Sequence, residues 1–445
     1  MKIIKSNCID MYKLYKKVKK IYKHTSILES LGCSDVKTSR YSIMGVIPDK
    51  ILKGNYNSTY LIDVKSGNEL KANWLKVMDE WTLCNEENCI SSPIQSGVIG
   101  YIGYENKFLF EKLDCTIKKD HNVPDVYLVK YALIMVFDRV TNEKYWVLDG
   151  VDENVCQDIE NMEIKKDEKD SFRVEKEINE DFTKSQYLDI ITKTKKYIAD
   201  GDIFQANMTM RFNGNYSGET FELYRHLRKI TPNPFFAFFD FEYPLISTSP
   251  ERFILLNGRE IFTNPIKGTI KRQIGGKDAS SILKNSEKDR AENTMIVDLM
   301  RNDIGRICEF GTVEVPVLCG VKKFNSIYHL ESIIYGKIRE NIKFSDILKA
   351  TFPGGSITGA PKIRAMNIIE ELELKKRGCY CGITGFFGSR GWVDTSIAIR
   401  TIYFDKNKFY FHGGGGIVAD SKEESEYQEL LLKLNSINYA LKKFI

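Results

Sequence analysis

The chain has 445 residues, 42% hydrophobic and 28% charged, and its 65 basic and 60 acidic residues give a net charge of +5. This length allows a large buried core in two or three domains, or one core with an accessory lobe. The small basic excess does not favour nucleic acid as a partner. The longest apolar run, residues 131–137, is too short to cross a bilayer, so we expect no membrane partner.

Ten cysteines are scattered along the chain without the paired spacing of a zinc site, the closest being Cys379 and Cys381. The basic N-terminus, Met1–Lys20, has no apolar stretch typical of a secretory signal. We therefore expect a reduced, cytoplasmic protein without a disulfide framework.

The first half of the chain contains predicted strands, at residues 59–64, 97–103 and 126–137. Segment 152–181 is crowded with Asp, Glu and Lys, which is typical of a surface connection or a solvated helix. It separates an expected N-terminal lobe, residues 1–165, from an expected C-terminal domain, residues 182–445.

The C-terminal part opens with a predicted helix, for which Thr183 and Gln186 form a capping box. Further helices are predicted over 219–230, 285–300, 361–374 and 422–441, and strands over 235–241, 254–256, 313–317, 395–404 and 408–412. The last two strands form a predicted hairpin across 405–407. Because strands and helices do not alternate strictly, we expect a mixed α/β fold of the α+β class with large antiparallel sheets.

Two acidic pairs have the spacing that places both side chains on one helix face: Asp289 with Glu292, and Glu426 with Glu429. Four converging carboxylates would suit Mg²⁺, which prefers oxygen ligands. Each pair alone is also common on a solvated helix face. The spacing therefore leaves both interpretations open.

Two glycine-rich stretches suggest close backbone approach to an anion. Residues 353–362 run into a helix with Pro361 at its first turn, where free backbone N–H groups bind anions. Residues 413–416 lie between a predicted strand and the helix that carries Glu426. A plain turn is the simpler interpretation of the second stretch.

Several single residues have both a functional and a structural interpretation. Arg400 lies in an otherwise apolar strand, where a charge must be paired or functional. Lys433 follows Glu429 by four residues and also suits a surface salt bridge. Lys267 follows Pro265 and could simply be a loop lysine, and His329 has apolar surroundings typical of a core histidine.

Taken together, seven ordered stretches resemble the chorismate-utilising enzymes, which include anthranilate, aminodeoxychorismate, isochorismate and salicylate synthases. The stretches are residues 202–207, 249–253, 265–269, 296–303, 353–362, 398–401 and 414–421. The resemblance implies two facing large antiparallel sheets with outer helices. It also implies that residues 182–445 form the catalytic domain, with the site in the cleft between the sheets.

The resemblance implies a role for most of these residues. Glu292 and Glu429 match direct Mg²⁺ ligands, with Asp289 and Glu426 beside them, and Glu251 matches a general acid for the departing ring hydroxyl. The positions that match residues holding the chorismate carboxylates or lining its ring are Tyr380, Arg400, Gly414, Gly415, Gly416, Lys433, His329 and Thr358. The chain departs from the family pattern at Asp289, more often Glu, and at Asn293, often His.

Two positions favour one branch of the family. Water-adding members have a lysine where this chain has Gln205, so the resemblance implies ammonia as the nucleophile. Lys267 matches the aminodeoxychorismate synthases, in which it would attack the ring, whereas anthranilate synthases usually have alanine there. The expected activity is amination of chorismate to 4-amino-4-deoxychorismate, for p-aminobenzoate and folate synthesis. The chain shows no glutaminase segment, so a glutamine amidotransferase subunit is the expected ammonia source.

Two alternatives remain at this stage: an anthranilate synthase component I, and a non-catalytic subunit that binds tryptophan or chorismate. The first is supported by residues 27–30 and 40–42, which are similar to the segment that holds tryptophan in anthranilate synthases. The expected tryptophan pocket comprises Ser30, Tyr41, Asn233, Pro234 and Phe235. The intact acidic quartet and Lys267 argue against a subunit that only binds.

Overall fold

The structure is a computed structural model that describes residues 1–32, 39–82, 94–163, 171–274, 277–324, 327–389 and 391–445. Its strands are antiparallel, and most of them join one continuous hydrogen-bonded network. The strands are β1 Lys2–Lys5, β2 Thr25–Glu29, β3 Tyr41–Asn55, β4 Ser58–Asp63, β5 Glu69–Ala72, β6 Gly97–Ile102, β7 Val126–Asp138, β8 Glu143–Leu148, β9 Phe172–Val174, β10 Asn179–Glu180, β11 Gln205–Gly218, β12 Phe235–Asp240, β13 Leu245–Ser249, β14 Arg252–Asn257, β15 Glu260–Asn264, β16 Ile266–Lys271, β17 Gln273–Ile274, β18 Lys277–Asp278, β19 Glu314–Lys323, β20 Ile327–Lys337, β21 Gly359–Ala360, β22 Ile383–Gly388, β23 Trp392–Ile397, β24 Thr401–Asp405 and β25 Lys408–Ile417.

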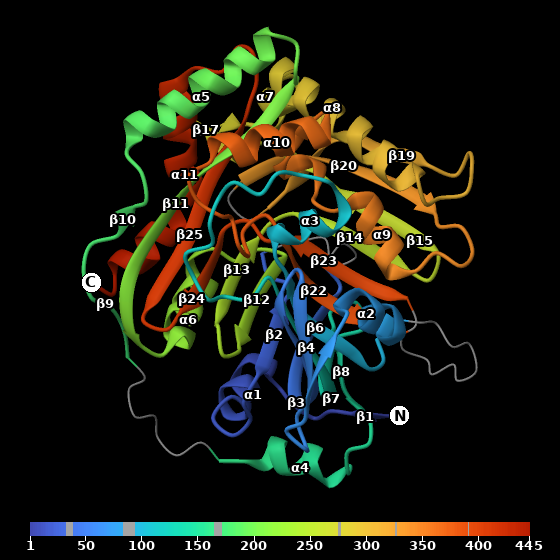
Figure 1. Cartoon of the computed structure of the whole chain (residues 1–445). Coiled ribbons are helices and arrows are strands. Elements are labelled where there is room, and N and C mark those ends of the chain that lie inside the picture. The colour runs from blue at the N-terminus through green and yellow to red at the C-terminus, as the bar shows by residue number, and fades with distance from the viewer. Residues whose placement is uncertain (33–38, 83–93, 164–170, 275–276, 325–326, 390) are drawn as a thin grey trace.

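Helices surround this network on the outside (Figure 1). They are α1 Met11–Val18, α2 Trp74–Thr82, α3 Lys107–Phe110, α4 Asn154–Asn161, α5 Lys184–Ala199, α6 Thr220–Ile230, α7 Ser280–Lys284, α8 Glu287–Gly305, α9 Phe344–Thr351, α10 Lys362–Leu372 and α11 Glu423–Lys442, with 3₁₀ turns η1 Tyr104–Asn106 and η2 Gly355–Ile357. No helix within the described ranges is long and apolar enough to cross a membrane. The mixed α/β fold expected from the sequence is confirmed.

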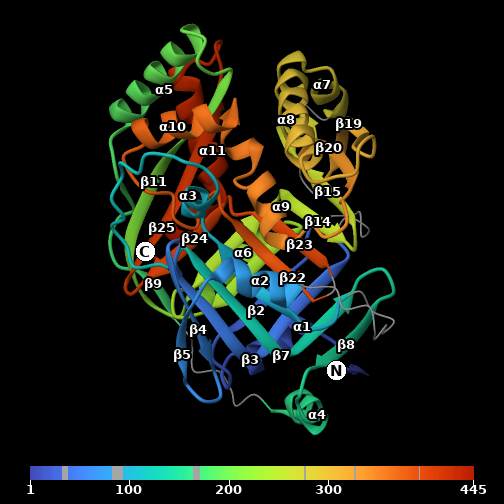
Figure 2. The ribbon, with the colours of Figure 1, turned by 45° about the vertical axis from the view of Figure 1, so that its right-hand side comes forward.

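The upper part of the molecule has two arms (Figure 2). One arm holds α5, α10 and α11 with β11 and β25, and the other holds α7 and α8 with β19 and β20. Strands from the first half of the chain pair with strands from the second, as β2 does with β12 and β6 with β22. The sheet therefore runs through both halves of the sequence and carries both arms.

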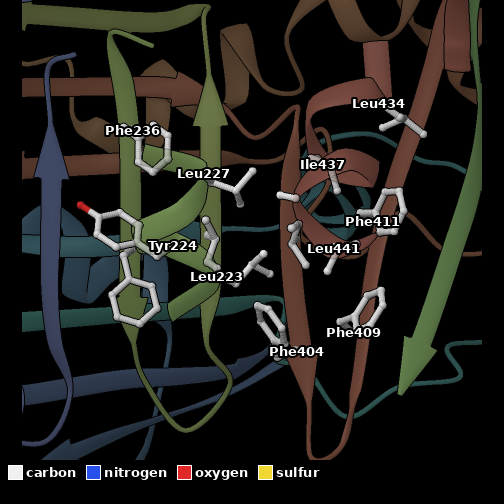
Figure 3. Close-up of a cluster of buried hydrophobic side chains, with 14 of the residues drawn as sticks. Leu223, Tyr224, Leu227, Phe236, Phe404, Phe409, Phe411, Leu434, Ile437 and Leu441 are labelled. Carbon is white, nitrogen blue, oxygen red and sulfur yellow. The ribbon is translucent and has the colours of Figure 1, made fainter. Parts of the chain in front are cut away.

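The first arm is built on a large apolar core. Aromatic side chains of β24 and β25 face leucine and isoleucine side chains of α6 and α11, and all are almost fully buried (Figure 3). Residues in this cluster include Leu223, Leu227, Phe404, Phe409, Phe411, Leu434, Ile437 and Leu441. Burial of each such side chain contributes roughly 1.5–3 kcal/mol, which fixes α11 against β25.

Strand β11 has two different faces, because successive side chains of a strand point in opposite directions. Ala206, Met208 and Met210 belong to the apolar core. Gln205 and Asn207, which alternate with them, are polar and also buried. A buried polar face must find partners in the protein or in a ligand.

Several sequence predictions are confirmed in detail. Thr183 and Gln186 form the expected capping box at the start of α5. Strands β24 and β25 form the expected hairpin, in which Asp405 pairs with Lys408. Within segment 152–181, the described residues contain α4 and the short strands β9 and β10 rather than only a connection.

Three predictions were wrong. The expected strand 395–404 is interrupted between Ile397 and Thr401, and Arg400 has a φ of 51°. Glycines 413–416 do not form a turn but belong to β25, paired with β11. Pro361 is the residue before α10 rather than its first turn.

Candidate active site

Lys267 is placed by a bulge in β16. Its strand pairs with β20, and the register shifts between Lys267 and Thr269, around Gly268. Gly268 has a φ of +62°, and a Cβ there would lie 2.9 Å from Cγ of Asp289. The bulge thus requires glycine for both conformation and space, and it brings Lys267 next to the start of α8.

The Lys267 amine lies among charged groups from several elements. Desolvation lowers its pKa, while the carboxylates of Glu292, Glu251 and Glu429 favour the charged form and Lys433 disfavours it. Burial without a dedicated partner is the condition under which a lysine becomes a nucleophile. Among the described residues, no hydrogen bond or ion pair fixes this ammonium.

Glu251 follows β13 and is anchored by its backbone, whose carbonyl accepts from Ile397 N at 3.1 Å. Only 5% of the residue is exposed, and Oε1 has no hydrogen-bond partner among the described residues. Burial raises the pKa of Glu251 to about 7, against the opposing effects of Ser356 and Lys267. A carboxyl group with this pKa carries a proton that it can donate near neutral pH.

Helix α8 presents Asp289 and Glu292. Asp289 is tied to the helix cap, since Ser286 Oγ donates to its Oδ2 at 2.6 Å. Glu292 is partly buried, and this burial raises its pKa, although Lys267 and Lys288 lower it. Lys288 Nζ lies 3.9 Å from Glu292 Oε1.

Helix α11 presents Glu426 and Glu429. Ser421 Oγ donates to Glu426 Oε1 at 2.7 Å. Glu429 forms an ion pair with Lys433 at 2.8 Å, and Lys433 lowers the pKa of that carboxyl group. Half of the Glu429 side-chain surface is exposed, so this carboxylate stays open to a further ligand.

The two acidic pairs lie on helices of different arms and interact electrostatically. Glu429 raises the pKa of Glu292, so the pairs interact although they belong to different helices. In the part of the chain that the structure describes, no three His, Cys, Asp or Glu side chains are gathered closely enough to hold a metal ion. The donor set has the hard oxygens that Mg²⁺ prefers, and Asp289, Glu426 and Glu429 each bond to a neighbouring side chain.

A partly buried cation lies at the break between β23 and β24. The guanidinium of Arg400 has no hydrogen bond or ion pair with any described residue, and burial lowers its pKa. Its carbonyl accepts from Thr248 N at 3.1 Å, which holds the left-handed conformation. An enclosed guanidinium without a carboxylate partner is suited to an anionic ligand.

Tyr380 lies close to Arg400, since it affects the pKa of that guanidinium. Its ring stacks on His412 of β25, with centroids 4.9 Å apart and planes 7° apart. Burial raises the pKa of Tyr380 well above its usual range, so its hydroxyl stays a hydrogen-bond donor.

Two further side chains keep polar atoms without partners among the described residues. These atoms are Oε1 and Nε2 of Gln205 and Nε2 of His329. His329 bonds to Thr269 Oγ1 through Nδ1, at 2.8 Å, and burial lowers its pKa to about 4, so the ring is neutral. Thr358, in contrast, donates to Gly354 O at 2.9 Å and holds its own loop.

The glycines of β25 form a wall beside these groups. A Cβ on Gly416 would lie 2.5 Å from Nε2 of Gln205, and one on Gly414 would lie 2.3 Å from Met208 O. Gly415 lies beside Glu426. Lys433 donates to Gly414 O at 3.1 Å. The strand therefore links Gln205 to the α11 carboxylates.

The expected tryptophan residues lie in a separate cavity. Its lining includes Ser30, Tyr41, Pro234 and Phe235, together with Trp392, whose ring meets Tyr41 edge-on at 5.3 Å. Asn233 does not line it. Instead, Asn233 donates to Thr248 O at 2.7 Å and accepts from Leu31 N at 3.1 Å, which joins the two sides of the cavity.

Sequence reasoning missed two residues near these groups, Ser356 and His412, and left the role of a third, Asn293, unassigned. Ser356 lies beside Glu251 and affects its pKa, and His412 stacks on Tyr380. Asn293 is buried, and its Oδ1 accepts from Ser332 Oγ and from Cys319 Sγ. Ser356 lies inside a stretch that was singled out, whereas a single histidine in a strand gives no signal.

Comparison with known proteins identifies the family to which the chain belongs. Residues 37–439 match the chorismate binding enzyme family, and the chain therefore belongs to this family. The resemblance seen in seven stretches of sequence is confirmed, and the protein is an enzyme of this type.

Relatives at the level of sequence fall into two groups. The chain is 42% identical over 359 residues to aminodeoxychorismate synthase component 1 of Escherichia coli, covering 79% of this chain and 78% of that protein. It is 32% identical to the protein of the same name from Bacillus subtilis, over 96% of this chain and 93% of that one. It is also 33% identical to anthranilate synthase component 1 of Lactococcus lactis, over 93% and 94%.

Solved structures share the fold over the full chain. Anthranilate synthase component I from Streptococcus pneumoniae superposes with a TM-score of 0.80 at 30% identity, covering 98% of this chain and 99% of that one. The isochorismate synthase MenF of Escherichia coli has a TM-score of 0.72 over 99% and 94%, at 13% identity, which speaks for the fold alone.

The protonation of Glu251 predicts a measurable effect of pH on stability. Because folding raises the pKa of Glu251 from 4.5 to about 7, its stabilising contribution is complete below pH 4.5 and is lost as the pH rises through 7. We expect Glu251→Gln to gain stability relative to wild type across this window, by roughly 3 kcal/mol at most. Urea unfolding at pH 5 and pH 8 without metal measures this. A difference that does not change with pH contradicts the assigned pKa.

Proposed function

We propose that the protein is the synthase subunit that aminates chorismate to 4-amino-4-deoxychorismate, for p-aminobenzoate and folate synthesis. The observation that carries this proposal is the enclosed amine of Lys267 beside the protonatable carboxyl group of Glu251. The relatives named aminodeoxychorismate synthase support it. An enzyme that used ammonia alone would not need a nucleophilic lysine at this place.

The first step would be nucleophilic. Neutral Lys267 attacks C2 of the chorismate ring, the double bonds shift, and the bond from C4 to its hydroxyl group breaks. Glu251 donates its proton to that hydroxyl, which leaves as water. Desolvation favours both required forms, the neutral amine and the protonated acid.

Ammonia would complete the reaction. It adds at C4, the double bonds shift back, and the bond between C2 and Lys267 breaks, which restores the amine. Gln205 matches the position at which water-adding relatives have a lysine, and an amide cannot take a proton at neutral pH. This supports ammonia rather than water as the nucleophile.

Donors at the site would hold the carboxylates of the substrate. Arg400 supplies a guanidinium with no protein partner among the described residues, and Tyr380 supplies a hydroxyl next to it. Lys433 and the backbone of Gly414–Gly416 lie near Glu426. His329, neutral with Nε2 without a partner among the described residues, and Thr358 would line the ring.

We further propose that Glu292 and Glu429 hold Mg²⁺, with Asp289 and Glu426 next to them. A bound cation supplies charge neutralisation for the ring carboxylate of chorismate. Glu429 is half exposed and Glu292 is partly exposed, so both carboxylates are accessible. Ser286 and Ser421 orient the two outer carboxylates by hydrogen bonds of 2.6 and 2.7 Å.

Ammonia would come from a second subunit. The relatives are named component 1, which implies a partner component for them. We propose that the partner of this chain is a glutamine amidotransferase, and that both act in the cytoplasm. Ammonium salts at high concentration should replace the partner.

The Lys267 role predicts a specific failure. Lys267→Arg keeps a positive charge but cannot act as a nucleophile, since arginine stays protonated. We expect both Lys267→Arg and Lys267→Ala to lose amination at least about 100-fold, the scale of a lost catalytic group. Chromatography and mass detection of products from chorismate, Mg²⁺ and ammonium measure it, with exposed Lys271→Arg on the same strand as control. Near-normal amination by Lys267→Arg would exclude the covalent role, and anthranilate from the wild type would exclude the proposed activity.

The metal proposal predicts a loss of binding. Glu292→Gln and Glu429→Gln each replace an anionic oxygen with a neutral one of the same shape, so we expect Mg²⁺ affinity to fall on the order of tenfold or more. Calorimetric titration of the free protein measures this, and the melting temperature should change little. Glu424→Gln, exposed on the same helix, is the matched control. Unchanged Mg²⁺ affinity in both variants would refute the ligand assignment.

We also propose that the cavity beside β2 and β12 binds tryptophan. Its aromatic lining of Tyr41, Phe235 and Trp392 suits an indole ring. We expect millimolar tryptophan to raise the melting temperature and to give a calorimetric binding signal, whereas alanine should do neither. Equal responses to the two amino acids, or none, would mean that the cavity is not a working tryptophan site.

A further inference from the structure

A buried ion pair lies behind the candidate active site, in the segment that follows α10. Arg377 is 1% exposed and Glu373 is 4% exposed. The guanidinium donates to both carboxylate oxygens, through Nε at 2.9 Å and through Nη2 at 2.7 Å. A buried pair of this kind gives little net stability compared with apolar side chains. Stability alone therefore does not explain its presence.

The remaining donors of the Arg377 guanidinium bind two segments of the candidate site, the loop before Thr358 and strand β11. Nη1 donates to the carbonyl of Ile357 at 2.8 Å, one residue before Thr358. Nη2 donates to the carbonyl of Asn207 at 2.6 Å, on the strand that begins with Gln205. Asn207 N also donates to Thr358 O at 2.7 Å. The guanidinium therefore fixes the loop of Thr358 relative to β11.

The same segment also contacts Tyr380 and, through Thr209, strand β25. Tyr380 N donates to the backbone carbonyl of Arg377 at 3.0 Å. Glu373 Oε1 accepts from Thr209 N and from Thr209 Oγ1, both at 2.9 Å. Thr209 is paired with Gly414 in the register of β11 and β25. One ion pair thus connects elements that are far apart in the sequence.

We propose that Arg377, held by Glu373, is a positioning residue that sets the mutual placement of Thr358, Gln205 and Tyr380 around chorismate. It touches no substrate atom and acts through the backbone of Ile357 and Asn207. The identity of the ligand, chorismate, rests on the proposed function. A lysine cannot replace Arg377, because it lacks the planar fork that makes several directed bonds at once.

The competing explanation is that Arg377 only stabilises the core. A matched pair exists nearby: Lys107 Nζ donates to Glu370 Oε2 at 2.9 Å, and both side chains are almost fully buried. Lys107 and Arg377 lie against the same ring, that of Tyr104, at 4.2 and 4.6 Å. Among the described residues, the side chains of Lys107 and Glu370 form no hydrogen bond with Ile357, Thr358, Asn207, Gln205 or Tyr380, although Glu370 also accepts from Lys376 Nζ at 2.6 Å. Their loss should therefore act mainly on stability.

The test compares chorismate affinity at matched stability. Dissociation constants for chorismate with Mg²⁺ and without ammonia are measured by calorimetry for wild type, Arg377→Met, Arg377→Lys and the double variant Lys107→Met with Glu370→Gln. Melting temperatures are measured alongside. We expect both Arg377 variants to bind chorismate on the order of tenfold or more weakly, since small misplacements of binding groups are costly. The double variant should keep affinity within about twofold of wild type.

A milder variant covers the case in which Arg377→Met does not fold. Glu373→Gln keeps an acceptor for Thr209 and removes only the charge that holds the guanidinium, so it should weaken chorismate binding less than Arg377→Lys does. Unchanged affinity in Arg377→Lys and Glu373→Gln, or an equal loss in the double variant, would overturn the positioning role. Wild-type protein that binds chorismate but forms a different product would refute the proposed function and leave this comparison intact.

Discussion

The site depends on the desolvation of two ionisable groups of opposite kind that lie close enough to affect one another. Desolvation disfavours the charged form of each, so it lowers the pKa of Lys267 and raises that of Glu251. In water, these groups would both be charged at neutral pH. Inside this protein, desolvation shifts the pair towards a neutral amine and a protonated acid, which is the combination that lysine attack and departure of a hydroxyl group require.

Unusual local structure surrounds the two groups. Gly268 is forced to a positive φ beside Asp289, and Arg400 takes a left-handed conformation that its carbonyl contacts with Thr248 maintain. Gln205 and His329 keep buried polar atoms without partners among the described residues. Such features are unfavourable in a ligand-free core, and they surround the same space. The broad sheet and the core between α6, α11 and β25 provide the stability that tolerates them.

Much of the scaffold could be predicted from sequence, because local chemistry fixes it. The capping box at Thr183 and the hairpin between β24 and β25 follow from short-range rules. The motif stretches contain Gln205, Glu251, Lys267, Thr358 and Arg400, whereas His329, Tyr380 and the four carboxylates of α8 and α11 lie outside them. The break at Arg400 could not be predicted, since Ser396 to Phe404 has the composition of a continuous strand. It depends on contacts with Thr248, which is far away in the sequence.

Other features needed the tertiary structure for the same reason. Glycines 413–416 suggested a turn, yet they allow β25 to lie close to β11, where Gly414 faces Met208 O. Asp289 and Glu292 share a spacing, but Ser286 binds one and Lys288 lies near the other. Arg377 follows two lysines and resembles a solvated surface residue, whereas it is fully buried against backbone carbonyls. Sequence identifies which residues can act, and long-range packing determines how each one is held.

The central claim is that Lys267 becomes covalently attached to the substrate ring. The most direct measurement is mass spectrometry of the wild-type protein after rapid quenching with chorismate and Mg²⁺ but no ammonia. We expect the peptide containing Lys267 to carry the ring of chorismate less one water, and added ammonium to remove this adduct and release 4-amino-4-deoxychorismate. An unmodified Lys267 in protein that goes on to form this product when ammonium is added would contradict the account.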